Sequence, residues 1–293
     1  MTTTEPQIAT PLTGKHLAAE IRRRTTERVA ALGTPTKLVV VTATDDESSL
    51  WYVRSIAKAA AAVGIDCDIA DLGPSASAAR IRAVLRDLSQ DPSVHGIILQ
   101  TPLPPGIALA DLAGEIDPSK DVDGANPASL GRLAAGQPGF APATAEAVLA
   151  LLDHHGVPLE GRNVAVVGRS TVVGTPAALL LLERRATVTV CHSRTADLAA
   201  HTSQADVVVV AVGKPGLINA AHVAPGAVVI DVGTTPSDDG SLLGDVDAAE
   251  VERVAGALTP VPGGVGPVTT TLLLSHTVDA AERTQSDVRE IRT

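Results

Sequence analysis

The chain has 293 residues, of which 45% are hydrophobic but only 1% aromatic, and its formal net charge at pH 7 is −10. The scarcity of aromatic side chains excludes the aromatic belts of membrane proteins and the stacking platforms of RNA-recognition and single-strand-binding proteins. The acidic balance argues against proteins that bind nucleic-acid backbones or anionic membranes. A core of Ala, Val, Leu and Ile favours parallel strands covered by helices, and the length is typical of about two domains.

The first half of the chain alternates between helical and extended patterns. Helices are predicted at Thr13–Leu32, Ser48–Val63 and Ala76–Leu88, and strands at Lys37–Thr42, Cys67–Leu72 and His95–Gln100. This alternation indicates a parallel sheet with right-handed crossovers. The following stretch, Pro102–Pro142, is rich in turn signals and is expected to be irregular. Loops of this length in compact domains are usually functional.

A second alternation follows a predicted helix at Thr144–His154. Strands are predicted at Asn163–Val167, Thr187–Cys191, Asp206–Val212 and Ala227–Val232, a Pro/Gly loop at Thr259–Gly266, and a last helix at Val268–Arg283. We expect an α/β protein of two domains, in which the last helix returns to the first domain. The predicted boundaries are 1–143 with 268–293 for an N-terminal αβ substrate domain, and 144–267 for a Rossmann-type domain inserted between its two parts.

The cysteine content, the N-terminal residues and the lengths of the apolar runs predict where the protein is located. Cys67 and Cys191 are too few and too far apart for a disulfide framework or a zinc site. The N-terminal residues lack the apolar core of a signal peptide, and no apolar run reaches the roughly 18 residues of a spanning helix. We therefore expect a soluble, cytoplasmic protein without a metal, and with neither nucleic acid nor membrane as partner.

A glycine-bearing loop follows the strand Asn163–Val167. It reads Gly168-Arg169-Ser170-Thr171-Val172-Val173-Gly174, with Ser170 where the usual dinucleotide fingerprint has its middle glycine. A tight turn that presents backbone amides and a helix N-terminus suits a pyrophosphate. An ordinary strand-to-helix turn is the alternative.

The end of the next strand distinguishes the two nicotinamide cofactors. An NAD site wants an acidic residue there for the ribose 2′-hydroxyl, whereas this strand ends in Cys191-His192-Ser193-Arg194. Ser193 and Arg194, with Arg169 as a further candidate, could bind a 2′-phosphate through charge-assisted hydrogen bonds. We therefore favour NADP over NAD. The alternatives are that Arg194 is a solvated surface residue and that His192 belongs to a turn.

Seven short motifs, taken in order, point to one family. They are YVRS at 52–55, QTPLP at 100–104, KDVDG at 120–124, GRS at 168–170 with VG at 173–174, VGKP at 212–215, IDVG at 230–233 and PVPGGVGP at 260–267. Over nearly the whole chain they resemble the methylenetetrahydrofolate dehydrogenase/cyclohydrolase family. The resemblance implies a folate-type substrate, an NADP domain and a homodimer.

The resemblance also assigns residues. It implies that Tyr52 stacks on the folate ring system, that Gln100 is the active-site glutamine and that Asp123 hydrogen-bonds the pterin. It places Pro262, Gly263 and Gly266 along the folate, and Gly168, Arg169, Ser170, Val173, Ser193, Arg194, Gly213 and Thr234 beside the cofactor. A carboxylate suits the pterin because the pterin edge presents adjacent donors. The residues alone leave other roles open: Tyr52 in the core, Gln100 on strand-end backbone groups and Asp123 in a turn.

One departure from the family pattern carries a functional consequence. Where the family has Tyr-x-x-x-Lys, with a lysine central to cyclohydrolase chemistry, this chain has Ile56. Lys58 lies roughly 200° around the helix from position 56, and Arg54 is a poor proton shuttle because a guanidinium stays protonated. Hydride transfer mainly needs two rings held face to face, whereas opening the methenyl product needs proton transfer. We predict a dehydrogenase whose cyclohydrolase activity is weak or absent.

Further departures keep two other functions open. Thr101 replaces a leucine of the family's QLPLP, the segment 142–147 loses a proline and a glycine, and Thr234 replaces an isoleucine. A specialised relative that carries out NADP-dependent redox chemistry at another C–N bond is one alternative. A non-catalytic module that binds folate or NADP is the other.

Overall fold

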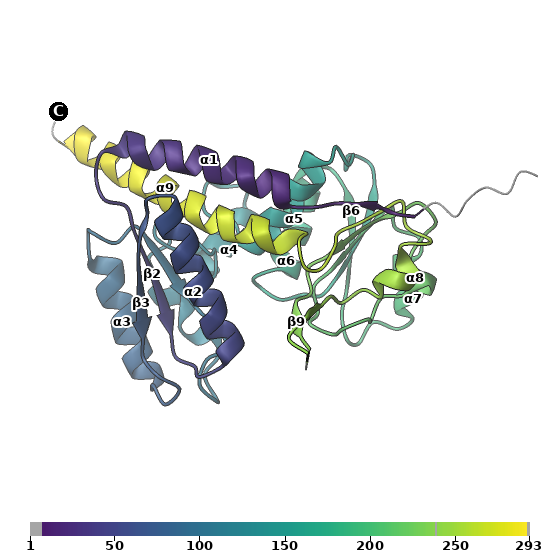
Figure 1. The fold of residues 1–293 in the computed structure, drawn as a ribbon, viewed down its shortest axis with the longest axis horizontal. Helices are drawn as coiled ribbons and strands as arrows, with labels where there is room; N and C mark the ends of the chain where they lie inside the picture. The colour runs from purple at the N-terminus through teal and green to yellow at the C-terminus, as the bar shows by residue number, and fades with distance from the viewer. Residues whose placement is uncertain (1–7, 238, 292–293) are drawn as a thin grey trace, which may run out of the picture. The chain divides into compact units, whose positions relative to one another are not determined.

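A computed structural model describes residues 8–237 and 239–291, with side chains as far as Ser286. It divides into two compact units (Figure 1): unit 1 comprises the residues up to Ala18 and Thr144–Thr269, and unit 2 comprises Ala19–Ala143 and the residues from Thr270 on. This division differs from the predicted boundaries at the N-terminus, where strand β1 (Thr10–Pro11) pairs with β11 (Ala257–Leu258) of unit 1. Residues 1–7, 238 and 292–293 of the predicted domains lie outside the described residues.

Unit 2 is built on a parallel sheet with the strand order β3-β2-β4. The strands are β2 (Lys37–Thr42), β3 (Asp66–Asp71) and β4 (Gly96–Leu99), and the helices between them are α2 (Glu47–Ala62) and α3 (Ala78–Gln90). The two helices cover opposite faces of the sheet (Figure 1). Five of the six residues of the central strand β2 are buried, which is why it reads as an uninterrupted apolar run. All five elements were predicted, to within a few residues at each end.

The connection after β4 contains more structure than predicted. Two short 3-10 helices, η1 (Leu109–Asp111) and η2 (Ala113–Glu115), precede the helix α4 (Pro127–Ala134). The expectation of an irregular stretch is wrong for α4. Its start signals are ordinary, since Asn126 accepts a hydrogen bond from the Ala128 amide and Pro127 occupies the first turn, but the neighbouring turn residues obscured them.

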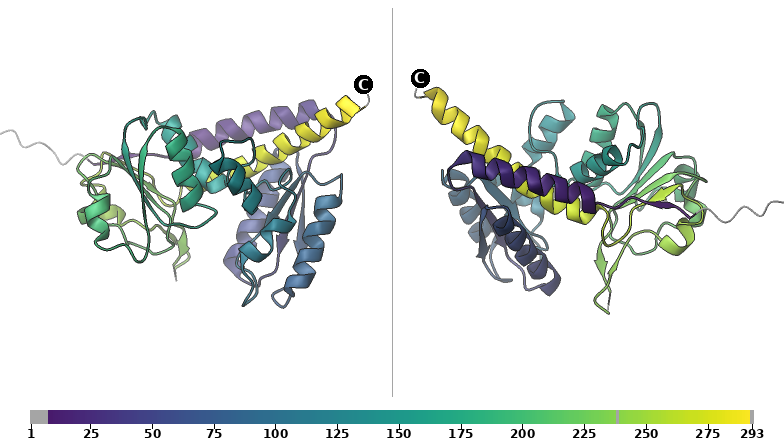
Figure 2. Two further views of the ribbon diagram at one scale, coloured as in Figure 1. Left: turned by 180° about the vertical axis from the view of Figure 1, so that it is seen from behind. Right: turned by 45° about the horizontal axis from the view of Figure 1, so that its top comes forward.

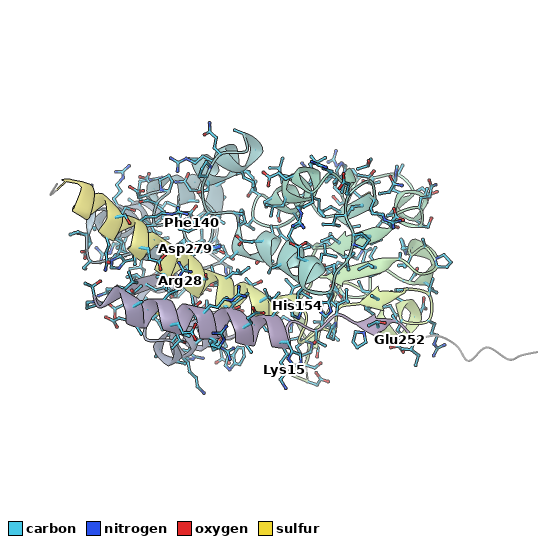
Figure 3. All side chains as sticks on the ribbon, turned by 90° about the horizontal axis from the view of Figure 1, so that it is seen from above. Lys15, Arg28, Phe140, His154, Glu252 and Asp279 are labelled. Atoms are coloured by element: carbon cyan, nitrogen blue, oxygen red, sulfur yellow. The ribbon has the colours of Figure 1, made fainter. Side chains whose placement is uncertain are left out.

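The first and last helices of unit 2 lie side by side (Figures 1 and 2). They are α1 (Lys15–Leu32) and α9 (Val265–Ile291), of which the residues from Thr270 on belong to unit 2. Arg28 on α1 points toward α9 (Figure 3), where its guanidinium binds Asp279 and Glu282, with Nε 3.0 Å from Glu282 Oε1. The expected return of the C-terminal helix to the first domain is confirmed.

Unit 1 holds a parallel sheet with the order β1-β11-β8-β7-β5-β6. Its longer strands are β5 (Asn163–Val167), β6 (Thr187–Cys191), β7 (Val207–Val210) and β8 (Val228–Asp231). The helices α5 (Ala143–His154) and α6 (Gly174–Glu183) cover one face, and α7 (Leu198–Thr202) and α8 (Ala248–Val251) cover the other (Figures 1 and 2). The two-domain α/β fold is thus confirmed.

The strand order of unit 1 reverses between β5 and β7. From β5 the chain moves through α6 to β6 at one edge, and then returns across β5 to β7 and β8. In such sheets ligands bind beyond the carboxyl ends of the strands at this switch point. The shorter elements η3 (Ala220–His222), the β9 (Thr235–Pro236)–β10 (Leu242–Leu243) hairpin and α8 complete the unit. No helix of the described part of the chain is long and apolar enough to span a membrane.

Candidate functional site

The glycine loop lies at the switch point of unit 1. Gly168 has a φ of +120°, and a Cβ there would collide with the carbonyl oxygen of Ala211, just after β7. A Cβ at Gly174, the first residue of α6, would collide with the carbonyl oxygen of Gly168. The two glycines therefore allow the β5 loop, the end of β7 and the start of α6 to pack closely, which is the geometry of a dinucleotide loop.

Ser170 shapes the approach to α6. Its hydroxyl oxygen accepts hydrogen bonds from the amides of Val173 and Gly174, at 3.1 and 3.4 Å. Ser170 and Arg169 are both exposed and lie beside a helix N-terminus. A diphosphate is favoured there by the helix dipole.

The turn after β6 displays the predicted 2′-phosphate residues. The ring Nδ1 of His192 accepts the Arg194 amide at 3.1 Å, and the His192 amide donates to Thr195 Oγ1 at 2.8 Å. His192 is therefore a turn residue. Ser193 and Arg194 are exposed, and among the described residues neither Arg194 nor Arg169 has an acidic partner. Both guanidinium groups are thus accessible to an anion.

The remaining predicted cofactor residues lie at the same edge of the sheet. Gly213 follows β7 with a φ of +65°, and Thr234 follows β8; both are exposed. The Gly168 amide donates to the Cys191 carbonyl at 2.9 Å, which joins the loop after β5 to the end of β6. Four loops at the carboxyl edge of one parallel sheet therefore carry the whole predicted cofactor set, and this arrangement fits a dinucleotide with a 2′-phosphate.

Tyr52 lies on α2 of unit 2 and is half-buried. Its hydroxyl is hydrogen-bonded to the side chain of Thr270 on α9, and burial raises the pKa of Tyr52 to about 12, with a further contribution from the charge of Asp123. The structure thus brings Tyr52 and Asp123 close enough to interact. The neighbouring Trp51 is 65% exposed. The side chain of Tyr52 is therefore partly accessible and lies near a carboxylate.

Asp123 is the most perturbed carboxyl of this unit. Burial, and secondarily the charge of Asp121, raises the pKa of Asp123 to about 7, against a lowering by His276. The turn contacts belong to Asp121 instead, whose carboxylate accepts the amides of Ala125 and Asn126 at 3.0 and 2.8 Å. Among the described residues the Asp123 carboxylate accepts no hydrogen bond. It is therefore a half-buried acceptor that is open to a ligand.

His276 was missed by the sequence analysis. It is buried on α9, and its Nδ1 lies 2.8 Å from the carbonyl oxygen of Val122, between the two aspartates. Because a carbonyl only accepts, Nδ1 carries the proton. The imidazole also packs on Phe140 at 5.1 Å between ring centroids. A lone histidine in the apolar run LLLSHTV was the available signal.

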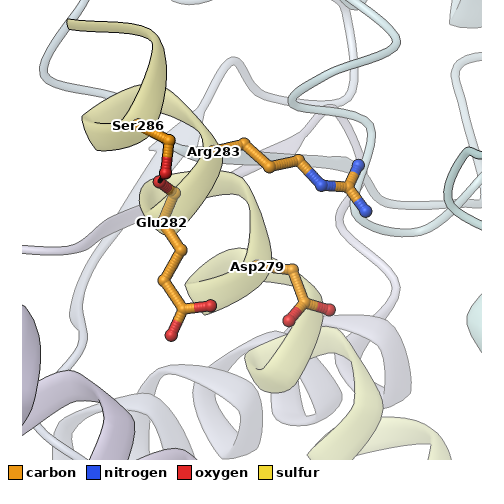
Figure 4. A pocket seen from close by; sticks show the side chains of 4 residues that line it. All are labelled: Asp279, Glu282, Arg283 and Ser286. Carbon is orange, nitrogen blue, oxygen red and sulfur yellow. Dashed lines mark hydrogen bonds between the residues drawn. The ribbon is translucent and has the colours of Figure 1, made fainter. Parts of the chain in front are cut away.

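The end of α9 carries a charged pocket that is a poor candidate site. It has a volume of about 280 Å³ and is lined by Asp279, Glu282, Arg283 and Ser286 (Figure 4). Asp279 and Glu282 bind Arg28, and the guanidinium of Arg283 lies 4.7 Å from the centre of the Phe140 ring. Its charged groups therefore already have partners within unit 2.

The side chain of Gln100 is hydrogen-bonded to the backbone of the next residue. Its Nε2 donates to the carbonyl oxygen of Thr101 at 2.7 Å, and Ser49 Oγ donates to the same oxygen at 3.2 Å. This contact is the alternative role that the sequence left open, in which Gln100 satisfies a backbone group at the end of its strand. Thr101 itself precedes a cis proline, Pro102.

Ile56 lies one helical turn after Tyr52 and is 0% exposed. It shares the buried face of α2 with Val53 and Ala60, whereas Lys58 is exposed. The predicted separation of positions 56 and 58 on α2 is thus confirmed. An aliphatic side chain therefore fills the position at which the resemblance implies a lysine.

The other lysines of unit 2 are engaged elsewhere. Lys37 forms an ion pair with Asp68 at 2.7 Å. Lys120 Nζ donates to the carbonyl oxygen of Asp91 at 2.6 Å, and burial lowers its pKa. Neither lysine can therefore provide the missing group without breaking these contacts.

The predicted folate loop belongs to unit 1. Pro262 follows a cis peptide bond, and Gly263 accepts the amide of Gly14 at its carbonyl oxygen, at 2.9 Å. The Gly264 amide donates to the Pro260 carbonyl oxygen at 2.8 Å, which closes the turn before α9. Pro262 and Gly266 are exposed, so this part of the loop is accessible to a ligand.

Comparisons with known proteins agree with this arrangement. Residues 12–123 match the catalytic domain of the tetrahydrofolate dehydrogenase/cyclohydrolase family, and residues 142–285 match its NAD(P)-binding domain. The chain is 66% identical over 273 residues to "Bifunctional protein FolD 1" of Rhodococcus jostii, covering 92% of each chain.

Two solved structures extend the comparison. FolD methylenetetrahydrofolate dehydrogenase/cyclohydrolase from Campylobacter jejuni superimposes with a TM-score of 0.90 at 39% identity, over 94% of this chain and 99% of the other. The FolD enzyme of Trypanosoma brucei, complexed with NADP cofactor and an inhibitor, superimposes with a TM-score of 0.89 at 37% identity. The match covers 94% of this chain and 98% of the other. The chain therefore belongs to the tetrahydrofolate dehydrogenase/cyclohydrolase family.

Proposed function

We propose that this protein oxidises 5,10-methylenetetrahydrofolate to 5,10-methenyltetrahydrofolate with NADP⁺, and that it hydrolyses the methenyl product weakly or not at all. The chain is an NADP-dependent dehydrogenase of its family. The observation that carries the proposal is the contrast on α2, where Tyr52 is half-buried beside Asp123 while the next turn presents only the buried Ile56.

NADP is supported by the fit of unit 1 and by the NADP complex of the Trypanosoma brucei relative. When bound, NADP⁺ supplies the hydride acceptor. The dipole at the start of α6 favours the diphosphate. Ser193 and Arg194, exposed after β6, and Arg169 bind the 2′-phosphate, because a guanidinium forms paired hydrogen bonds with phosphate oxygens.

Two side chains of unit 2 hold the folate in this proposal. Tyr52 is partly exposed and stacks its ring on the folate, and its hydroxyl is hydrogen-bonded to Thr270. Asp123 accepts hydrogen bonds from the adjacent donors of the pterin edge, since none of the described residues occupies its carboxylate. Both residues orient the substrate, which is most of what hydride transfer requires of a protein.

Hydrolysis of the methenyl product additionally requires a group that can transfer protons. Water must add to the bridging carbon of the methenyl product, and opening the ring needs proton transfers near neutral pH. Ile56 cannot transfer a proton. Among the lysines of unit 2, Lys37 is paired with an aspartate and Lys58 lies on the opposite face of α2. The third, Lys120, is bonded to carbonyl groups. The Rhodococcus relative is named bifunctional. The proposal for this chain differs from that name in one activity, the hydrolysis.

Separate assays of the two half-reactions test the proposal. Purified protein is given methylenetetrahydrofolate and NADP⁺, and formation of NADPH is followed; methenyltetrahydrofolate is then supplied alone, and its enzyme-dependent loss is measured. NADPH formation with little hydrolysis is expected. Absence of hydride transfer despite tight folate binding would favour the non-catalytic module, and redox activity confined to other substrates would favour action at another C–N bond.

The resemblance also leads us to propose a homodimer in the cytoplasm. Light scattering on the purified chain tests the assembly, because a dimer has twice the 29.7 kDa mass of one chain. A mass that stays at one chain over a range of protein concentrations would contradict the dimer.

A further inference from the structure

A buried carboxylate organises the loop that follows β7. Asp245 is 0% exposed, and its two oxygens accept three consecutive backbone amides, those of Val212 and Gly213 at 2.7 and 3.0 Å and that of Lys214 at 2.6 Å. All three loop residues are exposed. The backbone of the loop is therefore fixed by a buried side chain, while the loop residues themselves stay accessible to solvent.

This loop occupies a functional place in the sheet. It continues from the end of β7, where the carbonyl oxygen of Ala211 touches Gly168 of the glycine loop. The strand order reverses between β5 and β7, so both loops border the switch point. Turning the Val212–Lys214 amides inward toward Asp245 fixes the course of the backbone at that border.

A second carboxylate holds the first. Asp231, at the end of β8, accepts the backbone amides of Asp245 and Val246, each at 3.0 Å, and that of Gly233 at 2.9 Å. A Cβ at Gly233 would collide with the carboxyl group of Asp245. The ends of β7 and β8 and the segment after β10 are thus tied together by two aspartates.

We propose that Asp245 is a positioning residue for the cofactor, which holds the Val212–Lys214 backbone in the conformation that NADP needs before NADP arrives. The inference rests on the proposed function, since it assumes that NADP binds at this edge of unit 1. Preorganisation increases affinity because the entropy cost of ordering the loop is no longer subtracted from the free energy of binding. Asp245 itself needs no contact with the cofactor.

The test replaces one carboxylate oxygen. In Asp245→Asn the amide oxygen can still accept from Val212 and Gly213, but the new NH₂ group faces the Lys214 amide, so donor meets donor. NADP⁺ binding is measured by calorimetry, and the KM values for NADP⁺ and folate are measured separately. We expect NADP⁺ to bind at least about tenfold more weakly, with little change in the KM for folate.

A matched control lies two residues away. Asp247 accepts the Glu250 amide at 3.2 Å at the start of α8, and Asp247→Asn keeps a good cap because Asn serves this position as well as Asp. This variant is expected to bind NADP⁺ like the natural chain. A folded Asp245→Asn protein that also binds NADP⁺ normally would overturn the proposal.

Amide hydrogen exchange on the natural chain keeps the proposal testable if Asp245→Asn does not fold. The amides of Val212, Gly213 and Lys214 are expected to exchange slowly without NADP⁺, and equally slowly with it. Fast exchange that slows only on addition of NADP⁺ would contradict a preformed loop. If the natural chain binds no NADP⁺ at all, the proposed function fails and the positioning role fails with it, whereas normal NADP⁺ binding with fast loop exchange overturns the positioning role alone.

Discussion

The ionisation of Asp123 predicts how folate affinity depends on pH. Burial first, and the charge of Asp121 second, hold the pKa of Asp123 at about 7. Only the ionised carboxylate accepts hydrogen bonds from both adjacent pterin donors. With a single group of this pKa, about one tenth of the protein is competent at pH 6 and about nine tenths at pH 8. The KM for folate should therefore be about tenfold higher at pH 6 than at pH 8.

The assay measures initial rates at saturating NADP⁺ from pH 6 to pH 8.5. Saturation is needed because a 2′-phosphate also titrates near pH 6. In Asp123→Asn the KM should be raised and no longer vary with pH. In His276→Asn the acidic limb should move to higher pH, because the charge of His276 lowers the pKa of Asp123. A natural chain whose KM for folate does not vary with pH, or an Asp123→Asn protein whose KM still rises toward low pH, would contradict this role of Asp123.

The same ionisation predicts an opposite effect on stability. The pKa of Asp123 in the folded protein is above its ordinary value of 3.8, so folding favours the protonated form. The resulting stabilisation is complete below the ordinary pKa and is lost as the pH rises through about 7. Asp123→Asn should therefore gain thermal stability over the natural chain at pH 8 and gain clearly less at pH 5, where only part of the stabilisation is lost. Equal melting differences at both pH values would contradict the assigned pKa.

Three further substitutions, two of them with a control variant, test other parts of the site. Arg194→Ala should raise the KM for NADP⁺ about tenfold or more and leave that for NAD⁺ unchanged, whereas the exposed Arg253→Ala should alter neither in the same kinetic assay. Gly174→Ala should lower the unfolding free energy by about 1–3 kcal/mol and weaken NADP⁺ binding, because its Cβ collides with Gly168; an unchanged melting temperature would contradict this packing. Ile56→Lys should lower the unfolding free energy by at least about 2 kcal/mol, as measured by denaturant unfolding, whereas Ile56→Leu should cost less than about 1.5 kcal/mol.

Much of the fold could be predicted because its signals are local. The strand Lys37–Thr42 is an unbroken apolar run and lies where the sequence places it. The burial of Ile56 follows from its i, i+3 spacing after Val53, and the exposure of Lys58 from its place on the other side of the helix. The family, too, could be recognised, because its motifs are short, specific and ordered.

What was missed depends on contacts between distant segments. Strand β1 is two residues long and exists only because it pairs with Ala257 and Leu258. The hydrogen bonds from the Val212–Lys214 amides to Asp245 join residues that are 31 to 33 positions apart in the sequence. His276 likewise meets Val122 across 154 positions. No periodicity or composition signals such pairings.

We propose that Ile56, at the position where the resemblance implies a lysine, separates hydride transfer from hydrolysis. The most direct measurement is the rate at which the natural chain hydrolyses methenyltetrahydrofolate, compared with its own rate of NADPH formation under the same conditions. We expect fast NADPH formation and a hydrolysis rate near that of the buffer alone. Enzyme-dependent hydrolysis as fast as hydride transfer would contradict it.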